Sequence, residues 1–131
     1  MTTYIVDTHA LVWFLEKNSK LPKTARIALL DPIAQIILPT IVLTEITFLY
    51  SKRRTTIDLP IVLSEVASSS NCIVYPLDEE VVLRIPTNLN IHDAIIVATG
   101  LLFKELMEHD VAIITKDNSI KNSNLIKTVW A

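Results

Sequence analysis

Four acidic residues stand where an α/β fold would bring their carboxylates together. They are Asp7, Glu45, Asp93 and Asp117. Asp7 directly follows the apolar run 4–6, and Asp117 closely follows the apolar run 111–115. Both runs predict parallel strands, whose carboxyl ends meet at the ligand-binding edge of an α/β sheet. Clustered carboxylates suit a hard cation such as Mg²⁺ or Mn²⁺, which activates water and neutralises charge at a phosphate. The four acids therefore predict a metal-dependent phosphodiester hydrolase.

These acids differ in how well a structural role explains them. Asp7 precedes a predicted helix, and taken alone it is better explained as the cap of that helix than as a ligand. Asp93 lies three residues after Asn90, which is the spacing of a capping box. Glu45 lies on the edge of the inward stripe of its helix, where no capping role explains it. The acids 78–80 crowd the first turn of another predicted helix, which suits its dipole, so they are excluded from the site.

Composition excludes several other classes of protein. The chain has 131 residues, of which 50% are apolar, enough for one domain with a substantial core. The net charge of −2 does not indicate a nucleic-acid binder, although a local basic surface could still bind a polyanion. A single glycine, Gly100, excludes glycine-rich phosphate loops, and a single cysteine, Cys72, excludes an internal disulfide and a cysteine zinc site. No apolar run has the length of a membrane span and no signal peptide is recognised, so we expect a cytoplasmic protein.

Predicted strands and helices alternate along the chain. Strands are expected at 4–6, 35–38, 72–75 and 111–115, with an edge strand at 125–130. Helices are expected at 9–16, 22–31, 61–67, 77–85 and 90–108. One more helix begins at Thr40, its predicted cap, with an inward stripe of Val42, Ile46, Leu49 and Arg53. The pattern predicts a single α/β domain over residues 1–131, with helices on both faces of a central, mostly parallel sheet. Gly100 shares a helix face with Asp93 and would let another element approach closely.

The chain resembles PIN-domain proteins of the VapC toxin type in four segments that span almost its whole length. They are Val6-Asp7-Thr8-His9-Ala10-Leu11-Val12-Trp13, Leu43-Thr44-Glu45-Ile46, His92-Asp93-Ala94-Ile95-Ile96-Val97-Ala98 and Ile113-Ile114-Thr115-Lys116-Asp117. The resemblance implies a PIN-like three-layer α/β/α fold and a Mg²⁺- or Mn²⁺-dependent endoribonuclease. It also implies a homodimer that a small VapB-like antitoxin inhibits. The four acids would form the catalytic quartet, and Thr115 would supply the hydroxyl that orients them.

The candidate site combines metal ligands, a base and basic contacts to RNA. Asp7, Asp93 and Asp117 are predicted to bind the metal, and Glu45, also counted among its ligands, to position or deprotonate the attacking water. The residues predicted to hold the RNA backbone are Lys20, Lys52, Arg53 and Lys116. Lys52-Arg53-Arg54 has an alternative role as favourable charge at a helix C-terminus. If the acids converge, at least one of them should have a raised pKa, because adjacent like charges oppose ionisation.

Two positions depart from the pattern of the VapC-type relatives. Ala94-Ile95-Ile96 follows Asp93, where many relatives with the same start carry an arginine. His9 stands where serine is common in the wider family. A histidine beside a metal ligand could donate to phosphate, but a partly buried structural histidine is the better explanation of His9.

Three other functions are compatible with parts of the pattern. One is a PIN-like module that binds RNA or a protein partner without cutting, and another is an RNA-processing PIN nuclease that is not a toxin. The third is a phosphatase or receiver domain with an aspartate after its first strand. A haloacid-dehalogenase phosphatase needs a second aspartate where His9 stands, and a receiver needs paired acids after the first strand, where only Asp7 is present.

Overall fold

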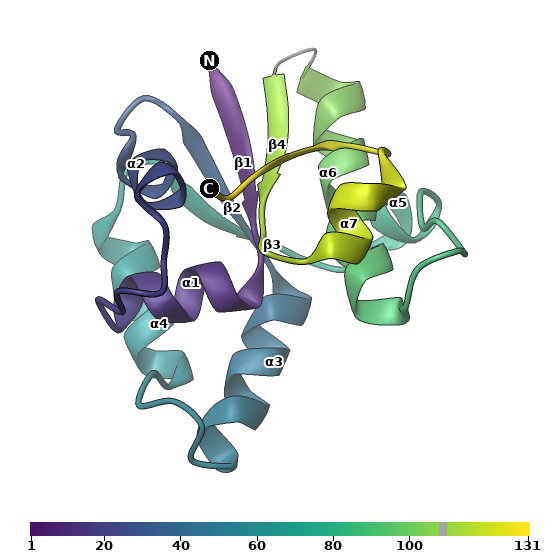
Figure 1. Ribbon diagram of the computed structural model, residues 1–131. Helices are drawn as coiled ribbons and strands as arrows, with labels where there is room; N and C mark the ends of the chain where they lie inside the picture. Colours follow the sequence, from purple (N-terminus) through teal and green to yellow (C-terminus); the bar gives the residue numbers. More distant parts are fainter. Residues whose placement is uncertain (108–109) are drawn as a thin grey trace.

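A parallel five-stranded sheet forms the centre of the computed structural model, which describes residues 1–107 and 110–131 (Figure 1). The strands are β1 (Thr2–Val6), β2 (Gln35–Pro39), β3 (Cys72–Tyr75), β4 (Asp110–Ile114) and β5 (Lys127–Val129). Their order across the sheet is β3-β2-β1-β4-β5, and every neighbouring pair is parallel. The strands β2 and β3 lie on one side of β1, and β4 and β5 lie on the other. The topological switch point of the sheet is therefore between β1 and β4, which is where open α/β sheets bind ligands.

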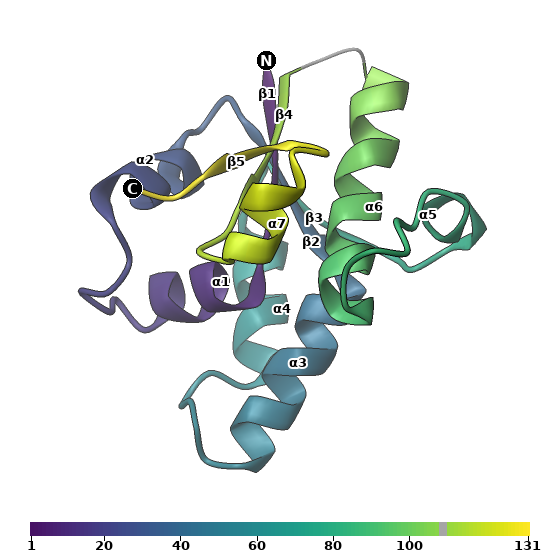
Figure 2. The ribbon, with the colours of Figure 1, turned by 45° about the vertical axis from the view of Figure 1, so that its right-hand side comes forward.

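Helices cover both faces of this sheet, as predicted. They are α1 (Thr8–Leu15), α2 (Lys23–Leu30), α3 (Thr40–Ser51), α4 (Leu59–Ser68), α5 (Glu79–Val82), α6 (Ile91–Met107) and α7 (Asn118–Ser123). Figure 1 shows α1, α2 and α4 on one side of the sheet and α5, α6 and α7 on the other. The first residues of α1, α3, α6 and α7 gather below the carboxyl ends of the strands, and the turned view of Figure 2 keeps them together. No helix in residues 1–107 and 110–131 is long and apolar enough to cross a membrane.

The core lies between the sheet and its two helical layers. Ile5, Ile37 and Ile113 are fully buried because strands covered on both faces must be apolar almost throughout. Gly100 of α6 faces the sheet as predicted: a Cβ there would lie 2.5 Å from Cδ1 of Ile126. Burial raises the pKa of the half-buried Cys72 thiol to about 11, as expected of a structural cysteine.

Several predicted details of α3 and α7 are wrong. The Thr40 hydroxyl does not cap α3 but accepts from the backbone N–H of Leu77 at 3.1 Å, joining the start of α3 to the loop before α5. Arg53 lies beyond the end of α3 in a left-handed conformation (φ 56°) and is exposed, so it is no part of the inward stripe. Helix α7 was not predicted, because Ile120 is its one buried residue and the 3.6-residue apolar pattern is absent.

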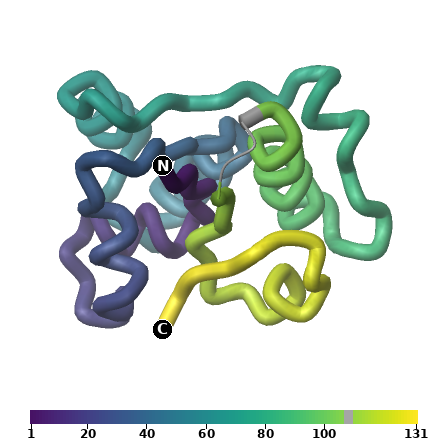
Figure 3. Tube along the Cα trace, turned by 90° about the horizontal axis from the view of Figure 1, so that it is seen from above, coloured from purple at the N-terminus to yellow at the C-terminus, as the bar shows by residue number. Residues whose placement is uncertain are grey.

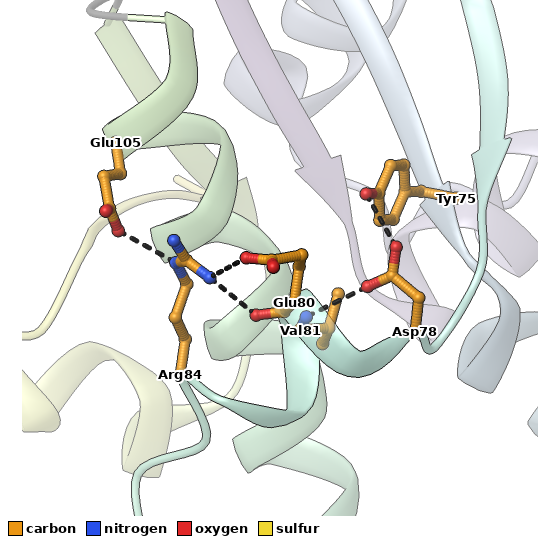
Figure 4. A network of polar contacts seen from close by, with 6 residues as sticks. All are labelled: Tyr75, Asp78, Glu80, Val81, Arg84 and Glu105. Carbon is orange, nitrogen blue, oxygen red and sulfur yellow. Dashed lines mark hydrogen bonds and ion pairs between the residues drawn. The ribbon is translucent and has the colours of Figure 1, made fainter.

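The acidic segment at α5 is structural, as its exclusion from the site predicted. Asp78 accepts from the backbone N–H three residues on at 3.0 Å and so caps α5, which is shorter than the predicted helix 77–85. Arg84 joins α5 to α6, with Nη1 3.0 Å from Oε2 of Glu80 and Nε 2.8 Å from Oε2 of Glu105 (Figure 4). These pairs satisfy two acids away from the carboxyl edge of the sheet.

Candidate active site

Asp7 lies at the carboxyl end of β1, at the switch point of the sheet. Its backbone N–H donates to the carbonyl of Ile114 at 3.0 Å, which holds it against the end of β4. One carboxylate oxygen accepts from the N–H of Thr8 at 2.7 Å, and the other accepts from the hydroxyl of Thr115 at 2.5 Å. Asp7 therefore occupies the cap position of α1 and also reaches across to β4, so the cap explains only one of its two oxygens.

Thr115 and Asp117 come from the turn between β4 and α7. The buried Thr115 hydroxyl accepts from the N–H of Asp117 at 3.0 Å while it donates to Asp7. Oδ1 of Asp117 accepts from the N–H groups of Ser119 at 2.7 Å and Ile120 at 3.1 Å, so this carboxylate caps α7. One hydroxyl thus connects the two acids that the sequence placed at the ends of neighbouring strands.

Asp93 sits at the start of α6 and is 8% exposed. The predicted capping box is present: the N–H of Asp93 donates to Oδ1 of Asn90 at 3.0 Å, and Nδ2 of Asn90 donates to Oδ2 of Asp93 at 2.7 Å. Ala94, Ile95 and Ile96 lie behind it in the core. The arginine of the relatives thus has no counterpart at these three positions, and the amide of Asn90 is a polar group that contacts Asp93.

Glu45 approaches the same edge from the second turn of α3, with 28% of its side chain exposed. Its Oε2 lies 3.8 Å from Nδ1 of His92, the neighbour of Asp93. The buried hydroxyl of Thr8 lies beside the Glu45 carboxylate and has no hydrogen-bond partner of good geometry in residues 1–107 and 110–131. Sequence reasoning missed Thr8, because a threonine at a helix start signals nothing unusual.

Burial and neighbouring carboxylate charges both oppose the ionisation of Asp7, Glu45 and Asp93. Burial, and after it the charge of Asp117, raises the pKa of Asp7. Burial, and then the charges of Asp7 and Asp93, raises the pKa of Glu45. Burial, and then the charges of Asp117 and Asp7, raises the pKa of Asp93. The expected raised pKa is present, but burial is its largest cause in all three acids, and the smaller like-charge contributions indicate that Asp7, Glu45, Asp93 and Asp117 lie near one another at this edge.

Comparison with known proteins identifies the family of this arrangement. Residues 4–123 match the family described as PIN domain. The chain belongs to the PIN domain family. Among solved structures, VapBC2 from Rickettsia felis, bound to a DNA fragment from their promoter, has a similar fold, with a TM-score of 0.65, 14% sequence identity and 96% of each chain covered. No curated protein matches the sequence.

The donor atoms of this PIN domain fit a hydrated hard cation. In the described residues, no three His, Cys, Asp or Glu side chains are arranged to hold a metal ion by themselves. Mg²⁺ does not need such a cage, since one or two carboxylates with several retained waters commonly hold it. The buried Thr8 hydroxyl, which has no partner of good geometry among the described residues, could accept a hydrogen bond from such a water. Like-charged oxygen donors and one unsatisfied hydroxyl are consistent with a divalent cation at this edge.

Two of the four predicted RNA contacts lie over one aromatic ring of the PIN domain, the indole of Trp13. Nζ of Lys116 lies 4.8 Å, and Nζ of Lys20 5.7 Å, from the ring centroid of Trp13. The His9 ring packs edge-on against the same indole, with centroids 5.5 Å apart. His9 is nevertheless exposed rather than partly buried as predicted, and partial desolvation, followed by the charge of Lys116, lowers its pKa and favours the neutral form. The sequence analysis did not predict that two ammonium groups lie over the indole of Trp13.

Lys52 and Arg53 lie apart from this site. They follow the last residue of α3, and Lys52 lies seven residues beyond Glu45, or about 10 Å along a helix at ~1.5 Å per residue. Both side chains are exposed. A phosphate bound by Lys52 and Arg53 would lie well away from the carboxylates. These two residues therefore belong to a different part of the surface from Lys20 and Lys116.

Proposed function

We propose that this PIN domain is a Mg²⁺- or Mn²⁺-dependent endoribonuclease that hydrolyses RNA phosphodiester bonds as the toxin of a toxin–antitoxin pair. The observation that carries the proposal is the meeting of Asp7, Glu45, Asp93 and Asp117 at the switch point of the sheet, where burial and neighbouring carboxylates raise the pKa of Asp7, Glu45 and Asp93. Membership of the PIN domain family, whose members are generally nucleases, supports the same chemistry.

Each residue of the proposed site has its own role in hydrolysis. Asp7, Asp93 and Asp117 would hold the cation directly or through retained waters, and Thr115 and Asn90 orient two of these carboxylates. When bound, the cation activates water and neutralises charge at the scissile phosphate. Glu45 positions the attacking water and accepts its proton, because a carboxylate with a raised pKa is a better general base near neutral pH. Lys20 and Lys116 hold backbone phosphates beside the acids.

The partner of this toxin is a VapB-like antitoxin, in a complex in which the toxin is a homodimer. Support comes from the fold shared with VapBC2 of Rickettsia felis. An apolar hollow of about 90 Å³ lies between α1, α2 and α4, and Leu11, Phe14, Leu29 and Val62 contribute to its lining. It suits one apolar side chain of an antitoxin. The toxin, with residues 1–131 acting as one domain, would meet both its RNA substrate and the antitoxin in the cytoplasm.

The test is cleavage of mixed cellular RNA by the purified protein, with Mg²⁺ or Mn²⁺ and with a chelator. Asp7→Asn and Glu45→Gln should each lower the metal-dependent rate by about a hundredfold or more. Glu79→Gln, a neutralised exposed acid in the first turn of α5, is the matched control and should cut like the wild type. Cutting that survives both site changes, or no cutting at all, would refute the catalytic proposal and favour a binding module.

A separate measurement tests the toxin assignment. A short neighbouring reading frame that encodes a DNA-binding antitoxin should yield a product that suppresses the cleavage when co-expressed. Cleavage without such a frame, or without suppression, would favour an RNA-processing nuclease over a toxin.

A further inference from the structure

A hollow of about 190 Å³ opens directly beside Asp117. It lies between the start of α7 and the chain that follows β5, and its lining includes Lys116, Asn118, Lys121 and Trp130. At about 30 Å³ per water molecule, this volume corresponds to about six waters, which is room for one planar heterocycle. An aromatic ring, an amide and two ammonium groups therefore surround a space that adjoins the candidate active site.

The backbone holds the Trp130 indole in place. The N–H of Thr115 donates to the carbonyl of Val129 at 3.2 Å, and the carbonyl of Trp130 accepts from the N–H of Ala25 at 3.2 Å. Figure 3 shows the C-terminal segment running from α7 back towards α2. Trp130 also packs against Trp13, with ring centroids 6.0 Å apart and planes inclined by 46°. The indole is thereby positioned next to Thr115, whose hydroxyl contacts Asp7.

The charges around the hollow complement a polyanion. Lys116 precedes Asp117 in the turn and Lys121 lies in the last turn of α7. Both lysines are exposed, so their ammonium groups can turn towards a bound phosphate. Lys20 extends the basic surface across Trp13. In a chain of net charge −2, these cations beside the carboxylates favour a bound phosphate backbone over a neutral ligand.

We propose that this hollow binds one nucleotide of single-stranded RNA, the one that flanks the cleaved bond. The base stacks on Trp130, the adjoining phosphate lies between Lys116 and Lys121, and the amide of Asn118 hydrogen-bonds the edge of the base. Aromatic rings bind unpaired bases by stacking, and amide groups can distinguish base edges by their donors and acceptors. The inference rests on the proposed ribonuclease function and names the part of the substrate next to the scissile phosphate.

Tryptophan fluorescence tests the stacking directly. The chain has two tryptophans, Trp13 and Trp130, and both belong to this cluster. The probe is a six-nucleotide single-stranded RNA of mixed sequence, added with Mg²⁺ to the Asp7→Asn protein so that cleavage does not interfere. In the additional background Trp13→Phe, the RNA should quench the remaining emission. Emission that does not change at saturating RNA would overturn the stacking proposal.

Affinity measurements with substituted proteins test the same contacts. Trp130→Leu should weaken RNA binding about tenfold, and Trp130→Phe should retain most of the affinity, because a smaller ring still stacks. Phe48→Leu, a change at an exposed aromatic residue of α3, is the matched control and should bind like the parent. If Trp130→Leu fails to fold, the exposed Lys121→Met tests the hollow, with the exposed Lys104→Met of α6 as its control.

Sequence preference separates this inference from the ribonuclease proposal. Asn118→Ala should change which base flanks the cut when a randomised RNA is cleaved and sequenced. Metal-dependent cleavage with unchanged preference in Asn118→Ala and unchanged affinity in Trp130→Leu would overturn the nucleotide site and leave the nuclease standing. Quenching in the Trp13→Phe background together with weaker RNA binding by Trp130→Leu, without cleavage by the wild type, would support the site and refute the nuclease.

Discussion

Replacing Thr115 by valine should destabilise the protein most strongly at neutral pH. The side chain is buried, and its hydroxyl donates to the Asp7 carboxylate at 2.5 Å and accepts from the N–H of Asp117 at 3.0 Å. Valine has nearly the same shape but can make neither bond. The change therefore leaves a partly buried carboxylate with one donor fewer and a backbone N–H without its acceptor.

The size of the effect follows from the two bonds. A hydrogen bond to a charged group contributes about 1.5–3 kcal/mol, and a neutral one about 0.5–1.5 kcal/mol. Thr115→Val should thus lower the free energy of unfolding by about 2–4 kcal/mol when Asp7 is ionised. For a protein of this size the melting temperature should fall by about 10 °C. The rate of RNA cleavage should fall as well, because Asp7 loses the donor that orients it.

The loss of stability should shrink in acid. Burial raises the pKa of Asp7, so the ionised carboxyl destabilises the fold at neutral pH, and the bond from Thr115 offsets part of this. As the pH falls through the pKa of Asp7, the carboxyl takes up a proton and the charge-assisted part of the bond is lost. The two proteins should then differ by only about 1 kcal/mol.

Chemical denaturation followed from pH 7 to about pH 4, near the pKa of an ordinary aspartate, measures this difference. Thr115→Ser keeps the hydroxyl and should lose only about 1 kcal/mol, at every pH. Thr99→Val removes another buried hydroxyl, which donates to the carbonyl of Ile95 at 2.8 Å inside α6, and its effect should not depend on pH. A Thr115→Val protein as stable as the wild type at pH 7, or equally destabilised in acid, would refute the reasoning.

Three further predictions concern the core, the metal and the basic surface. Gly100→Ala should lower the free energy of unfolding by about 1–2 kcal/mol, measured by denaturation, because the new methyl group meets Ile126 while alanine only partly compensates through its helix propensity. Mg²⁺ should raise the melting temperature more at pH 7 than at pH 5. The reason is that the pKa values of Asp7 and Asp93 are raised, so protons compete with the cation for these carboxylates in acid. An equal rise in melting temperature at both pH values would contradict this. Lys116→Met should reduce the salt dependence of RNA binding by about one ion in a log–log plot, whereas an unchanged slope would remove Lys116 from the phosphate contacts.

Local sequence patterns were sufficient to predict the elements that carry the acids. The runs before Asp7 and Asp117 are apolar because parallel strands are buried on both faces, so their positions and common edge could be predicted. Asn90 and Asp93 form a capping box within one helical turn, which needs no tertiary information. The Thr40 cap was wrong because the hydroxyl found a partner 37 residues away, at Leu77.

What the sequence by itself determined is the alternation of strands and helices, the all-apolar strands and the placement of acids at strand ends and helix starts. Only the tertiary structure decided that β1 lies between β2 and β4. It also decided that Trp13 contacts Trp130 and the ammonium groups of Lys20 and Lys116. Lys52, by contrast, lies at the far end of α3. The reason is physical. Hydrophobic periodicity and caps depend on neighbours within a few residues, whereas contacts between distant segments depend on how the crossovers order the strands.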